Sequence, residues 1–148
     1  MMITIQKFDK NQNFPDEKQE EINAFLYHSL QEYGDPKEDI NAAIEYAIGK
    51  NNSPGGFVLT ANEGEKIIGS VVVNCTGMKK YIPENILVYI ATDPDYRGKG
   101  VGKKLMETAL ELAEGSVALH VEPNNPAKGL YEKLGFTNKY LEMRYIKE

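Results

Sequence analysis

The chain has 148 residues and a mass of 16.6 kDa, a size that predicts one domain over residues 1–148 with its own hydrophobic core. Its net charge of −5 argues against general binding to nucleic acid phosphates, which requires a concentrated basic surface. A single cysteine excludes an internal disulfide framework and a cysteine-based zinc site, and we expect no metal. The first residues lack the features of a secretory signal and no stretch is apolar enough to cross a membrane, so we expect a cytoplasmic protein.

Along the first half of the chain, apolar residues alternate with polar ones or recur at helical spacing, and this pattern predicts the elements. In chain order these are an edge-like strand over 2–8, a helix over 15–33, a helix over 36–48 and hairpin strands over 57–61 and 66–74. We expect Gly34 to end the first helix in a left-handed conformation. Asp35 is then the N-cap of the second helix, with Pro36 as its first residue and Glu38 as the reciprocal capping partner.

The second half alternates strands with helices, which is typical of an α/β domain. Its expected elements are a strand over 85–92, a helix over 101–113, a strand over 117–121, a helix that begins at Asn125 and Pro126, and a closing strand pair or one bent strand over 136–146. The run over 85–92 is almost continuously apolar, which favours a central strand buried on both faces. In the helix over 101–113, we expect Leu112 to face inward together with Val101 and Leu105.

A glycine-rich segment lies between the strand over 85–92 and the helix that follows. Its residues are Arg97, Gly98, Lys99, Gly100, Val101, Gly102 and Lys103. Three glycines let the backbone approach a ligand closely, and the start of a helix adds unpaired N–H groups and the positive end of its dipole. We therefore interpret this segment as a cradle for an anion such as pyrophosphate. The simpler alternative is a solvent-exposed glycine loop with scattered lysines.

Known phosphate-binding patterns differ in how well they fit this segment. A P-loop requires Gly, four residues, then Gly-Lys followed by Ser or Thr, and no register of the segment supplies it. A dinucleotide fingerprint requires a third glycine where Lys103 stands, although Glu122 lies where its acidic residue would be, so this alternative stays open. The third pattern is Arg or Gln, two residues, Gly, one residue, then Gly or Ala. Arg97, Gly100 and Gly102 satisfy it.

Two blocks of the sequence resemble the GNAT superfamily of N-acetyltransferases. The first block is ATDPDYRGKGVGKKLM, and the second is LHVEPNNPAKGLYEKLGF, in which the residues at the family's positions are Asn124, Ala127, Tyr131, Gly135 and Phe136. The resemblance implies a three-layer α/β (α+β) fold, in which about four helices flank a mixed central sheet of about six to seven strands. Splayed central strands would form a cleft for acetyl-CoA.

The resemblance also implies which residues form the acetyl-CoA site. The pantetheine arm would pair with the backbone of Ile90, Ala91 and Thr92, and the pyrophosphate would lie on the glycine-rich segment. Asn124 would bond to the pantetheine arm, although a cap of the last helix is the alternative role. Tyr131 would protonate the departing thiolate, because a phenol keeps its proton at neutral pH. The helical spacing of Tyr131 also fits an ordinary core aromatic.

The general base and the acceptor site are less sharply defined. No acidic residue lies inside the strand over 85–92, so Glu84, which directly precedes it, is the candidate base. The resemblance makes the first helices the acceptor wall, with Tyr27, His28 and Tyr33 as its candidate residues. The acidic residues near them would attract a cationic amine, or they form an ordinary solvated helix face.

Together these observations predict an acetyl-CoA-dependent N-acetyltransferase in which a primary amine attacks directly in a ternary complex. The acceptor would be a small molecule or a peptide, whereas nucleic acid and membrane are not expected as partners, and a homodimer is left open. The alternative is a non-catalytic acyl-CoA-binding sensor or assembly module that uses the same cleft. Neither the acceptor amine nor the length of the acyl group follows from the sequence.

Overall fold

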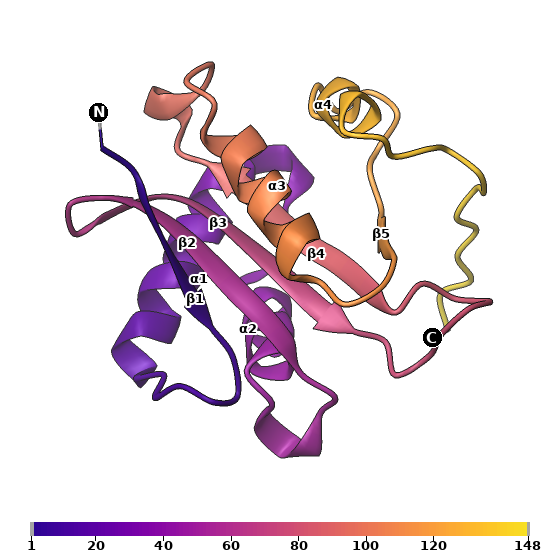
Figure 1. Ribbon diagram of the computed structural model, residues 1–148, viewed down its shortest axis with the longest axis horizontal. Coiled ribbons are helices and arrows are strands. Elements are labelled where there is room, and N and C mark those ends of the chain that lie inside the picture. The colour runs from indigo at the N-terminus through magenta and orange to yellow at the C-terminus, as the bar shows by residue number, and fades with distance from the viewer. Residues whose placement is uncertain (1, 148) are drawn as a thin grey trace.

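The computed structural model describes residues 2–147, in which a mixed β-sheet lies between two layers of helices (Figure 1). Within these residues the sheet has five strands in the order β1-β2-β3-β4-β5. Their bounds are β1 Thr4–Phe8, β2 Gly56–Glu63, β3 Lys66–Cys75, β4 Asn85–Thr92 and β5 Val117–Leu119. The first four strands pair antiparallel with their neighbours, whereas β5 runs parallel to β4.

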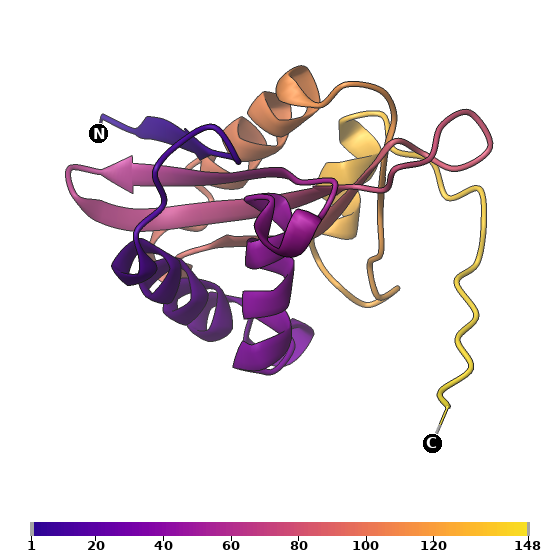
Figure 2. The ribbon, with the colours of Figure 1, turned by 90° about the horizontal axis from the view of Figure 1, so that it is seen from below.

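Four α-helices cover the sheet, as the sequence predicts. They are α1 Asp16–Leu30, α2 Lys37–Ala47, α3 Val101–Leu112 and α4 Lys128–Lys133, with short 3-10 turns η1 Gln31–Tyr33, η2 Lys50–Asn52 and η3 Pro94–Tyr96. Figure 2 shows α1 and α2 on one face of the sheet and α3 on the other. Tyr131 joins α4 to the layer of α3, because its ring belongs to the core cluster beneath that helix. No helix among residues 2–147 is both long and apolar enough to span a bilayer.

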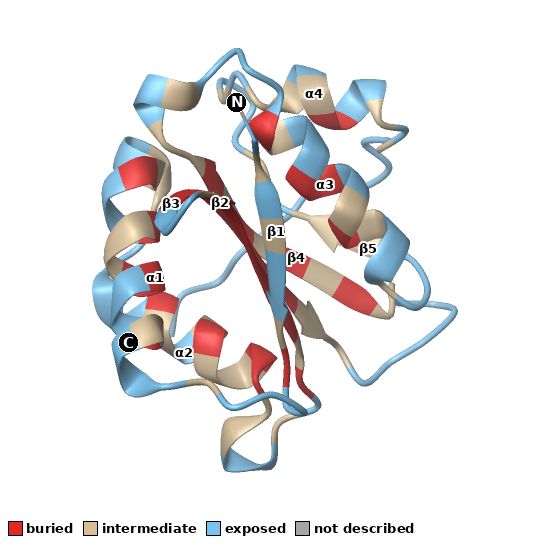
Figure 3. Cartoon of the chain, turned by 60° about the vertical axis from the view of Figure 1, so that its left-hand side comes forward, coloured by how far each residue is buried: buried red, intermediate tan, exposed pale blue. Residues whose placement is uncertain are grey.

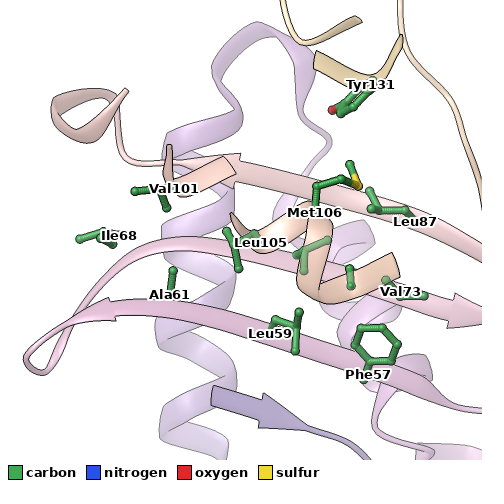
Figure 4. Close-up of a cluster of buried hydrophobic side chains, with 12 residues drawn as sticks. Phe57, Leu59, Ala61, Ile68, Val73, Leu87, Val101, Leu105, Met106 and Tyr131 are labelled. Carbon is green, nitrogen blue, oxygen red and sulfur yellow. The ribbon is translucent and has the colours of Figure 1, made fainter. Parts of the chain in front are cut away.

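The two helical layers bury opposite faces of the sheet, because successive residues of a strand point to opposite sides. On β2, Phe57 and Leu59 belong to the cluster under α3, drawn in Figure 4, whereas Val58 belongs to the cluster under α1 and α2. Figure 3 shows that buried residues run along β2 and β3, whereas β1 is largely exposed. A fully buried side chain such as Leu59 contributes about 1.5–3 kcal/mol to folding, and β2 and β3 together supply nine of the 23 buried hydrophobic residues.

An irregularity in β4 separates this strand from β5. Val72 of β3 pairs with Tyr89 and Val73 pairs with Leu87, so Val88 is an extra residue in β4. Such a bulge bends its strand and increases the local twist. The parallel pairing of β4 with β5 begins at Asn85 and ends at Leu87, directly before the bulge. Beyond Leu87 the backbone of β4 has no partner strand on the β5 side, which agrees with the expected opening between the central strands.

The prediction of a closing strand over 136–146 is wrong within the residues that the structure describes. Residues 137–147 form neither helix nor strand and are exposed, so the sheet has five strands instead of the expected six or seven. The alternating sequence is compatible with an extended backbone, but a strand also requires hydrogen bonds to a neighbour. In this conformation of the chain no neighbouring strand supplies them.

Two expectations at the junction of α1 and α2 are also wrong. Gly34 is extended, with φ −99°, and Gln31 takes the positive φ of 54° instead, because the turn η1 continues α1 beyond Leu30. Asp35 does not cap α2, which follows Pro36 without a side-chain cap. The carboxylate of Asp35 accepts a hydrogen bond from the hydroxyl of Tyr89 on β4 instead.

Burial within β4 and α3 differs from the expectation in detail. Residues of β4 alternate between buried and half-buried, because its faces are only partly covered beside the open edge. Leu112 is 40% exposed at the end of α3, and Met106 faces the core instead. Met106 lies one residue after Leu105 and widens the inward face of the helix beyond the predicted stripe.

Candidate active site

The backbone of β4 is open toward β5 over residues 88–92. Ile90, Ala91 and Thr92 each pair with a residue of β3 on one side, but the pairing with β5 has already ended at Leu87. Backbone N–H and C=O groups on the β5 side are therefore free to bind an extended ligand as an added strand would. The structure thus brings these three predicted residues to the edge of an opening between two strands.

A hollow of about 250 Å³ lies where β4 ends. Its lining residues are Thr92, Tyr96, Arg97, Gly98, Gly100, Val101, Gly102, Lys103 and Leu130. The glycine-rich segment therefore forms one wall and Leu130 of α4 contributes another. The predicted cradle residues come together here, except Lys99, whose side chain does not line the hollow.

Two glycines of this segment have backbone conformations that favour glycine. Gly98 has φ +77° and Gly100 has φ +82°, and nothing lies within 4 Å of the place where a Cβ would stand on either. The open space leaves both peptide units accessible to a ligand. Gly102 lies inside α3, where a Cβ would stand 3.4 Å from Thr92 Oγ1, so its absence keeps the helix close to the end of β4. The first turn of α3 therefore presents its unpaired N–H groups toward the hollow.

The basic side chains of the segment have different surroundings. Arg97 donates a hydrogen bond of 3.2 Å to the carbonyl oxygen of Ser29, so its guanidinium joins the loop to the last turn of α1. The Nζ of Lys99 lies 5.2 Å from the ring centre of Tyr96. Lys103 is exposed on the first turn of α3 and lines the hollow. Arg97 and Lys103 therefore both line the hollow, but a hydrogen bond holds Arg97 whereas Lys103 is exposed.

Tyr131 is both a core residue and a neighbour of the opening. Its side chain is 7% exposed and belongs to the cluster under α3, with its ring centre 6.0 Å from that of Phe136. Figure 4 shows Tyr131 at the periphery of this cluster, on the side of α4. Burial raises the pKa of its phenol above the ordinary value, so the hydroxyl stays protonated at neutral pH. Both interpretations of Tyr131 are thus compatible with its position.

Asn124 and Tyr33 meet across the molecule. The hydroxyl of Tyr33 in η1 donates to the backbone oxygen of Asn124 over 3.4 Å. The last helix was expected to begin at Asn125 and Pro126, but α4 begins at Lys128 without a side-chain cap. Asn125 instead orders the turn before the helix, where its Oδ1 accepts a hydrogen bond of 2.9 Å from the N–H of Ala127. The exposed side chain of Asn124 is therefore free of a capping role.

The carboxylate of Asp35, whose sequence position predicts a helix cap, lies beside the bulge in β4. The hydroxyl of Tyr89 donates to Asp35 Oδ2 over 2.5 Å, and Tyr89 directly follows the bulged Val88. Burial and this hydrogen bond raise the pKa of Tyr89 far above its ordinary value. Asp35 is exposed, so its other oxygen can meet a ligand. The pattern of Asp35, Pro36 and Glu38 fits a helix cap completely. Nothing in it therefore indicates the hydrogen bond to Tyr89.

Glu84 lies apart from the other candidate residues. Its carboxylate accepts hydrogen bonds from the N–H groups of Ser116, at 2.8 Å, and Lys80, at 3.1 Å. These bonds lower its pKa, which makes the group a weaker base. Glu84 precedes β4, whereas the glycine-rich segment follows it, and a strand of this length separates them by about 25 Å at ~3.3 Å per residue. Glu84 therefore has the contacts of a structural residue.

Tyr27 and His28 lie together, with their ring centres 5.7 Å apart, whereas Tyr33 lies in the turn η1 that follows α1. Tyr27 lies beside α2, with the Nζ of Lys37 at 5.2 Å from its ring centre. His28 lines a different hollow, of about 440 Å³, together with Glu21 and Asp93. Of the three expected acceptor residues, Tyr33 alone contacts the connection between β5 and α4. Residues 2–147 also contain no group of three or more histidine, cysteine or acidic side chains that could hold a metal ion.

Comparison with known proteins identifies the type of domain to which more than half of the chain corresponds. A family model described as the acetyltransferase (GNAT) domain matches residues 54–138. The peptidyl-lysine N-acetyltransferase YjaB of Salmonella typhimurium is 52% identical over 44 residues, which are 30% of this chain and 30% of the relative. The N-alpha-acetyltransferase RimI of Mycobacterium tuberculosis is 30% identical over 97 residues, which are 64% of this chain and 61% of the relative. The chain thus spans less than two thirds of the length of either relative.

Solved structures share the fold over nearly the whole chain. The crystal structure of PH1933 from Pyrococcus horikoshii OT3 has a TM-score of 0.70 and 25% identity, and covers 96% of this chain and 93% of its own. The aminoglycoside N-acetyltransferase AAC(6')-Iy in complex with CoA has a TM-score of 0.69 and 17% identity, and covers 99% of this chain and 95% of its own. The latter identity is low, so this likeness concerns the fold alone.

Proposed function

The chain belongs to the GNAT acetyltransferase family, and from this premise we propose that it transfers an acetyl group from acetyl-CoA to a primary amine of a small molecule or a peptide. The proposal assigns the reaction to one domain over residues 1–148 and requires no metal. It rests most directly on the end of the β4–β5 pairing at Leu87, next to the bulge at Val88. An opening of this kind exposes strand amides to a ligand while the rest of the sheet stays intact.

Acetyl-CoA would lie along this opening. The amides of the glycine-rich segment and the first turn of α3 would bind the pyrophosphate, and Lys103 would add a positive charge. The pantetheine arm would pair with the backbone of Ile90, Ala91 and Thr92, and Asn124 would bond to it from the other side. A strand amide near Ile90 would then donate to the thioester oxygen as negative charge develops there.

The chemical step would be direct attack of the amine in a ternary complex. The nitrogen forms a bond to the thioester carbon, and the carbon–sulfur bond breaks as the tetrahedral intermediate collapses. Tyr131 donates its phenolic proton to the departing thiolate and recovers a proton from solvent. Its raised pKa supports this role, because the hydroxyl is protonated throughout the neutral range.

Asp35 replaces Glu84 as the carboxylate that we propose on the acceptor side. Tyr89 belongs to the core beneath α1 and α2, so its hydrogen bond holds Asp35 on the face of β4 opposite α3. A cationic amine would bind there by charge and would lose its proton to Asp35 or to water before it attacks. The phosphate cradle and the acceptor would thereby approach the opening from opposite faces.

A non-catalytic acyl-CoA-binding module is the second candidate, because a cradle serves binding and catalysis alike. The deciding experiment combines calorimetry with acetyl-CoA and an assay of thiol release over a panel of amines. The panel begins with peptide lysines and protein N-terminal amines, the acceptors in the names of the two curated relatives, and adds alkylamines, polyamines and aminoglycosides. Turnover with any amine supports the enzyme. Tight binding without turnover across the panel contradicts it and supports the module.

A further inference from the structure

The residue that precedes the glycine-rich segment, Tyr96, is held by the end of the β2–β3 hairpin. Its hydroxyl donates a hydrogen bond of 2.7 Å to the carboxylate of Glu63, the last residue of β2. Tyr96 lines the hollow at the end of β4, whereas Glu63 does not. Glu63 therefore influences a ligand in that hollow through Tyr96 or through its charge, and not by direct contact.

The hairpin provides a firm anchor because its contact residues belong to a paired ladder. Glu63 and Lys66 form the last pair between β2 and β3, so strand pairing fixes their positions independently of the two turn residues between them. The Nζ of Lys66 lies 5.1 Å from the ring centre of Tyr96 and 3.9 Å from Oδ2 of Asp93, which directly follows β4. Both strands of the hairpin therefore contact the turn η3.

Tyr96 is held by its ring and its backbone as well as by its hydroxyl. The ring is half-buried and packs against the core cluster under α3. The N–H of Tyr96 donates to the carbonyl oxygen of Asp93 over 2.8 Å, which closes the turn η3. The hydrogen bond to Glu63 raises the pKa of the Tyr96 hydroxyl, so this group stays protonated and donates throughout the neutral range.

The glycines that follow Tyr96 have little intrinsic order. Gly98 and Gly100 are exposed, and nothing lies within 4 Å of the place where a Cβ would stand on either. Glycine loses more conformational freedom on ordering than any other residue. The far end of the segment is held where the buried Val101 begins α3. A ligand that requires one conformation of this segment binds more tightly when the near end is also held in advance.

We propose that Tyr96 is a positioning residue for acetyl-CoA, and that its hydrogen bond to Glu63 holds the glycine-rich segment in the conformation that binds the pyrophosphate. This inference rests on the proposed function, because it takes acetyl-CoA as the ligand of the segment. It gives the β2–β3 hairpin a role in binding, since the hairpin anchors the loop that receives the cofactor. Glu63 already accepts the hydrogen bond of the Tyr96 hydroxyl, so Tyr96 acts through the backbone that follows it.

Calorimetry with acetyl-CoA tests the hydrogen bond between Tyr96 and Glu63. Tyr96→Phe keeps the ring and removes the donor, whereas Glu63→Ala removes the acceptor. We expect each variant to bind about fivefold to tenfold more weakly, as a segment that is competent in about 10–20% of molecules would. The KM for acetyl-CoA should rise by the same factor, and kcat at saturation should not change. Glu63→Gln should bind like the wild type, because its amide oxygen can still accept the hydrogen bond.

Further variants separate the hydrogen bond from the charge of Glu63 and from a general loss of stability. The double variant Tyr96→Phe, Glu63→Ala should bind no more weakly than either single variant, because the same bond is lost in all three. Tyr46→Phe removes a hydroxyl of α2 that also donates a 2.7 Å bond, and it should keep the wild-type affinity. Wild-type affinity in Tyr96→Phe overturns the proposal. Equally altered affinities in Glu63→Gln and Glu63→Ala also overturn it, because they assign the effect to charge.

Limited proteolysis of the full chain without ligand tests the same hydrogen bond independently of acetyl-CoA. Trypsin cuts after Arg97 and Lys99, which are exposed within the segment. We expect both cuts to be about threefold faster or more in Tyr96→Phe and Glu63→Ala than in the wild type and Glu63→Gln. The cut after Lys10, which is exposed elsewhere, should keep its rate.

The two measurements distinguish failure of this inference from failure of the proposed function. Unchanged cuts at Arg97 and Lys99 in the variants of a chain that binds acetyl-CoA overturn the positioning role and leave the proposed function in place. Faster cuts in the variants of a chain that binds no acetyl-CoA support the hydrogen bond as the anchor of the segment. The same result contradicts acetyl-CoA as the ligand, and with it the proposed function.

Discussion

β2 and β3 pair at eight positions, whereas β4 and β5 pair at three. The six inner residues of β2 are all buried, but every residue of β5 is only half-buried. The hairpin contributes nine of the 23 buried hydrophobic residues, whereas the β4–β5 pair leaves the backbone of β4 without a strand partner on that side beyond Leu87. The difference teaches that one sheet can combine a fully buried hairpin with a strand pair that is open over part of its length.

Removal of the Tyr131 hydroxyl should have the largest effect on the β4–β5 side. Tyr131→Phe keeps almost all of the buried apolar area, so we expect the free energy of unfolding to change little. Turnover should fall by about 10²–10⁴, because the thiolate loses its proton donor. Acetyl-CoA affinity should change much less, because the lost interaction strengthens only as charge develops on sulfur.

Single-turnover measurements are needed for Tyr131→Phe, since slow product release can mask the chemical step. Tyr46→Phe is a suitable control, because it removes a hydroxyl that donates a 2.7 Å bond to the Cys75 carbonyl on the far side of the sheet. The control should lose about 1 kcal/mol of stability and keep its turnover. A wild-type single-turnover rate in Tyr131→Phe would return this tyrosine to a purely structural role.

A substitution that leaves a cavity in the hairpin should lower stability and leave ligand binding unchanged, the reverse of the result expected for Tyr131→Phe. Leu59 is fully buried, so Leu59→Ala should lower the free energy of unfolding by about 2–5 kcal/mol in chemical denaturation. Acetyl-CoA affinity of the folded fraction should remain close to that of the wild type. Leu112→Ala, at a leucine that is 40% exposed, provides the control and should lose under about 1 kcal/mol. Equal losses for the two leucines would contradict the burial of Leu59 in the core.

A comparison of two glycines tests the cradle separately from backbone strain. Gly100, with φ +82°, and Gly64 in the hairpin turn, with φ +61°, both have open space where a Cβ would stand. Valine at either position therefore costs a similar backbone strain of about 1–3 kcal/mol. Gly100→Val should weaken acetyl-CoA binding about tenfold or more in calorimetry, whereas Gly64→Val should not change it. Equal affinities of the two variants would remove the pyrophosphate from this segment.

Asp35→Asn tests the acceptor side with a smaller expected effect. The amide keeps the size of the carboxylate but loses its charge, so kcat/KM for a cationic amine should fall about tenfold, consistent with the loss of one charged contact of about 1–2 kcal/mol. The affinity for acetyl-CoA should not change. Tyr89→Phe leaves the charge in place and should have a weaker effect on kcat/KM. Unchanged kinetics in Asp35→Asn for every cationic substrate would exclude an acceptor role.

The smallest effect is expected for the pH dependence of stability at Glu84. Its folded pKa lies below its ordinary value, so its contribution to stability is present above the unfolded pKa and is lost as the pH falls through the folded pKa. Glu84→Gln should therefore be less stable than the wild type at pH 7, and the two should converge in strong acid. A difference that grows in acid would contradict the hydrogen bonds to Ser116 and Lys80 as its origin.

Local sequence signals predict local conformation well. The glycines at 98, 100 and 102 predict an open loop before α3, and the structure shows positive φ at Gly98 and Gly100 and close approach at Gly102, which are properties of single residues. The bulge at Val88 has no comparable signal, since it stands in an apolar run without glycine or proline and depends on the pairing of β3 with β4. The role of Asp35 depends on Tyr89, which lies 54 residues away in the sequence.

The C-terminal segment illustrates the same limit in a different way. Its alternating pattern is compatible with an extended backbone, but the pattern alone does not supply the neighbouring strand that a sheet requires. The closing strand expected over 136–146 is absent from the described residues for that reason. A strand is a property of a pair, so a pattern in one segment predicts a conformation and leaves the partner undetermined.

The hydrogen bond from Arg97 to the carbonyl of Ser29 has a consequence for how the two ends of the proposed site communicate. The bond uses one of the five N–H donors of the guanidinium, so the remaining donors can reach a pyrophosphate on the loop while the end of α1 stays held. Arg97 would then connect an occupied glycine-rich segment with the last turn of α1, which continues directly into the turn that carries Tyr33. Occupancy at one end of β4 would in this way be felt at the helix that we propose as part of the acceptor wall.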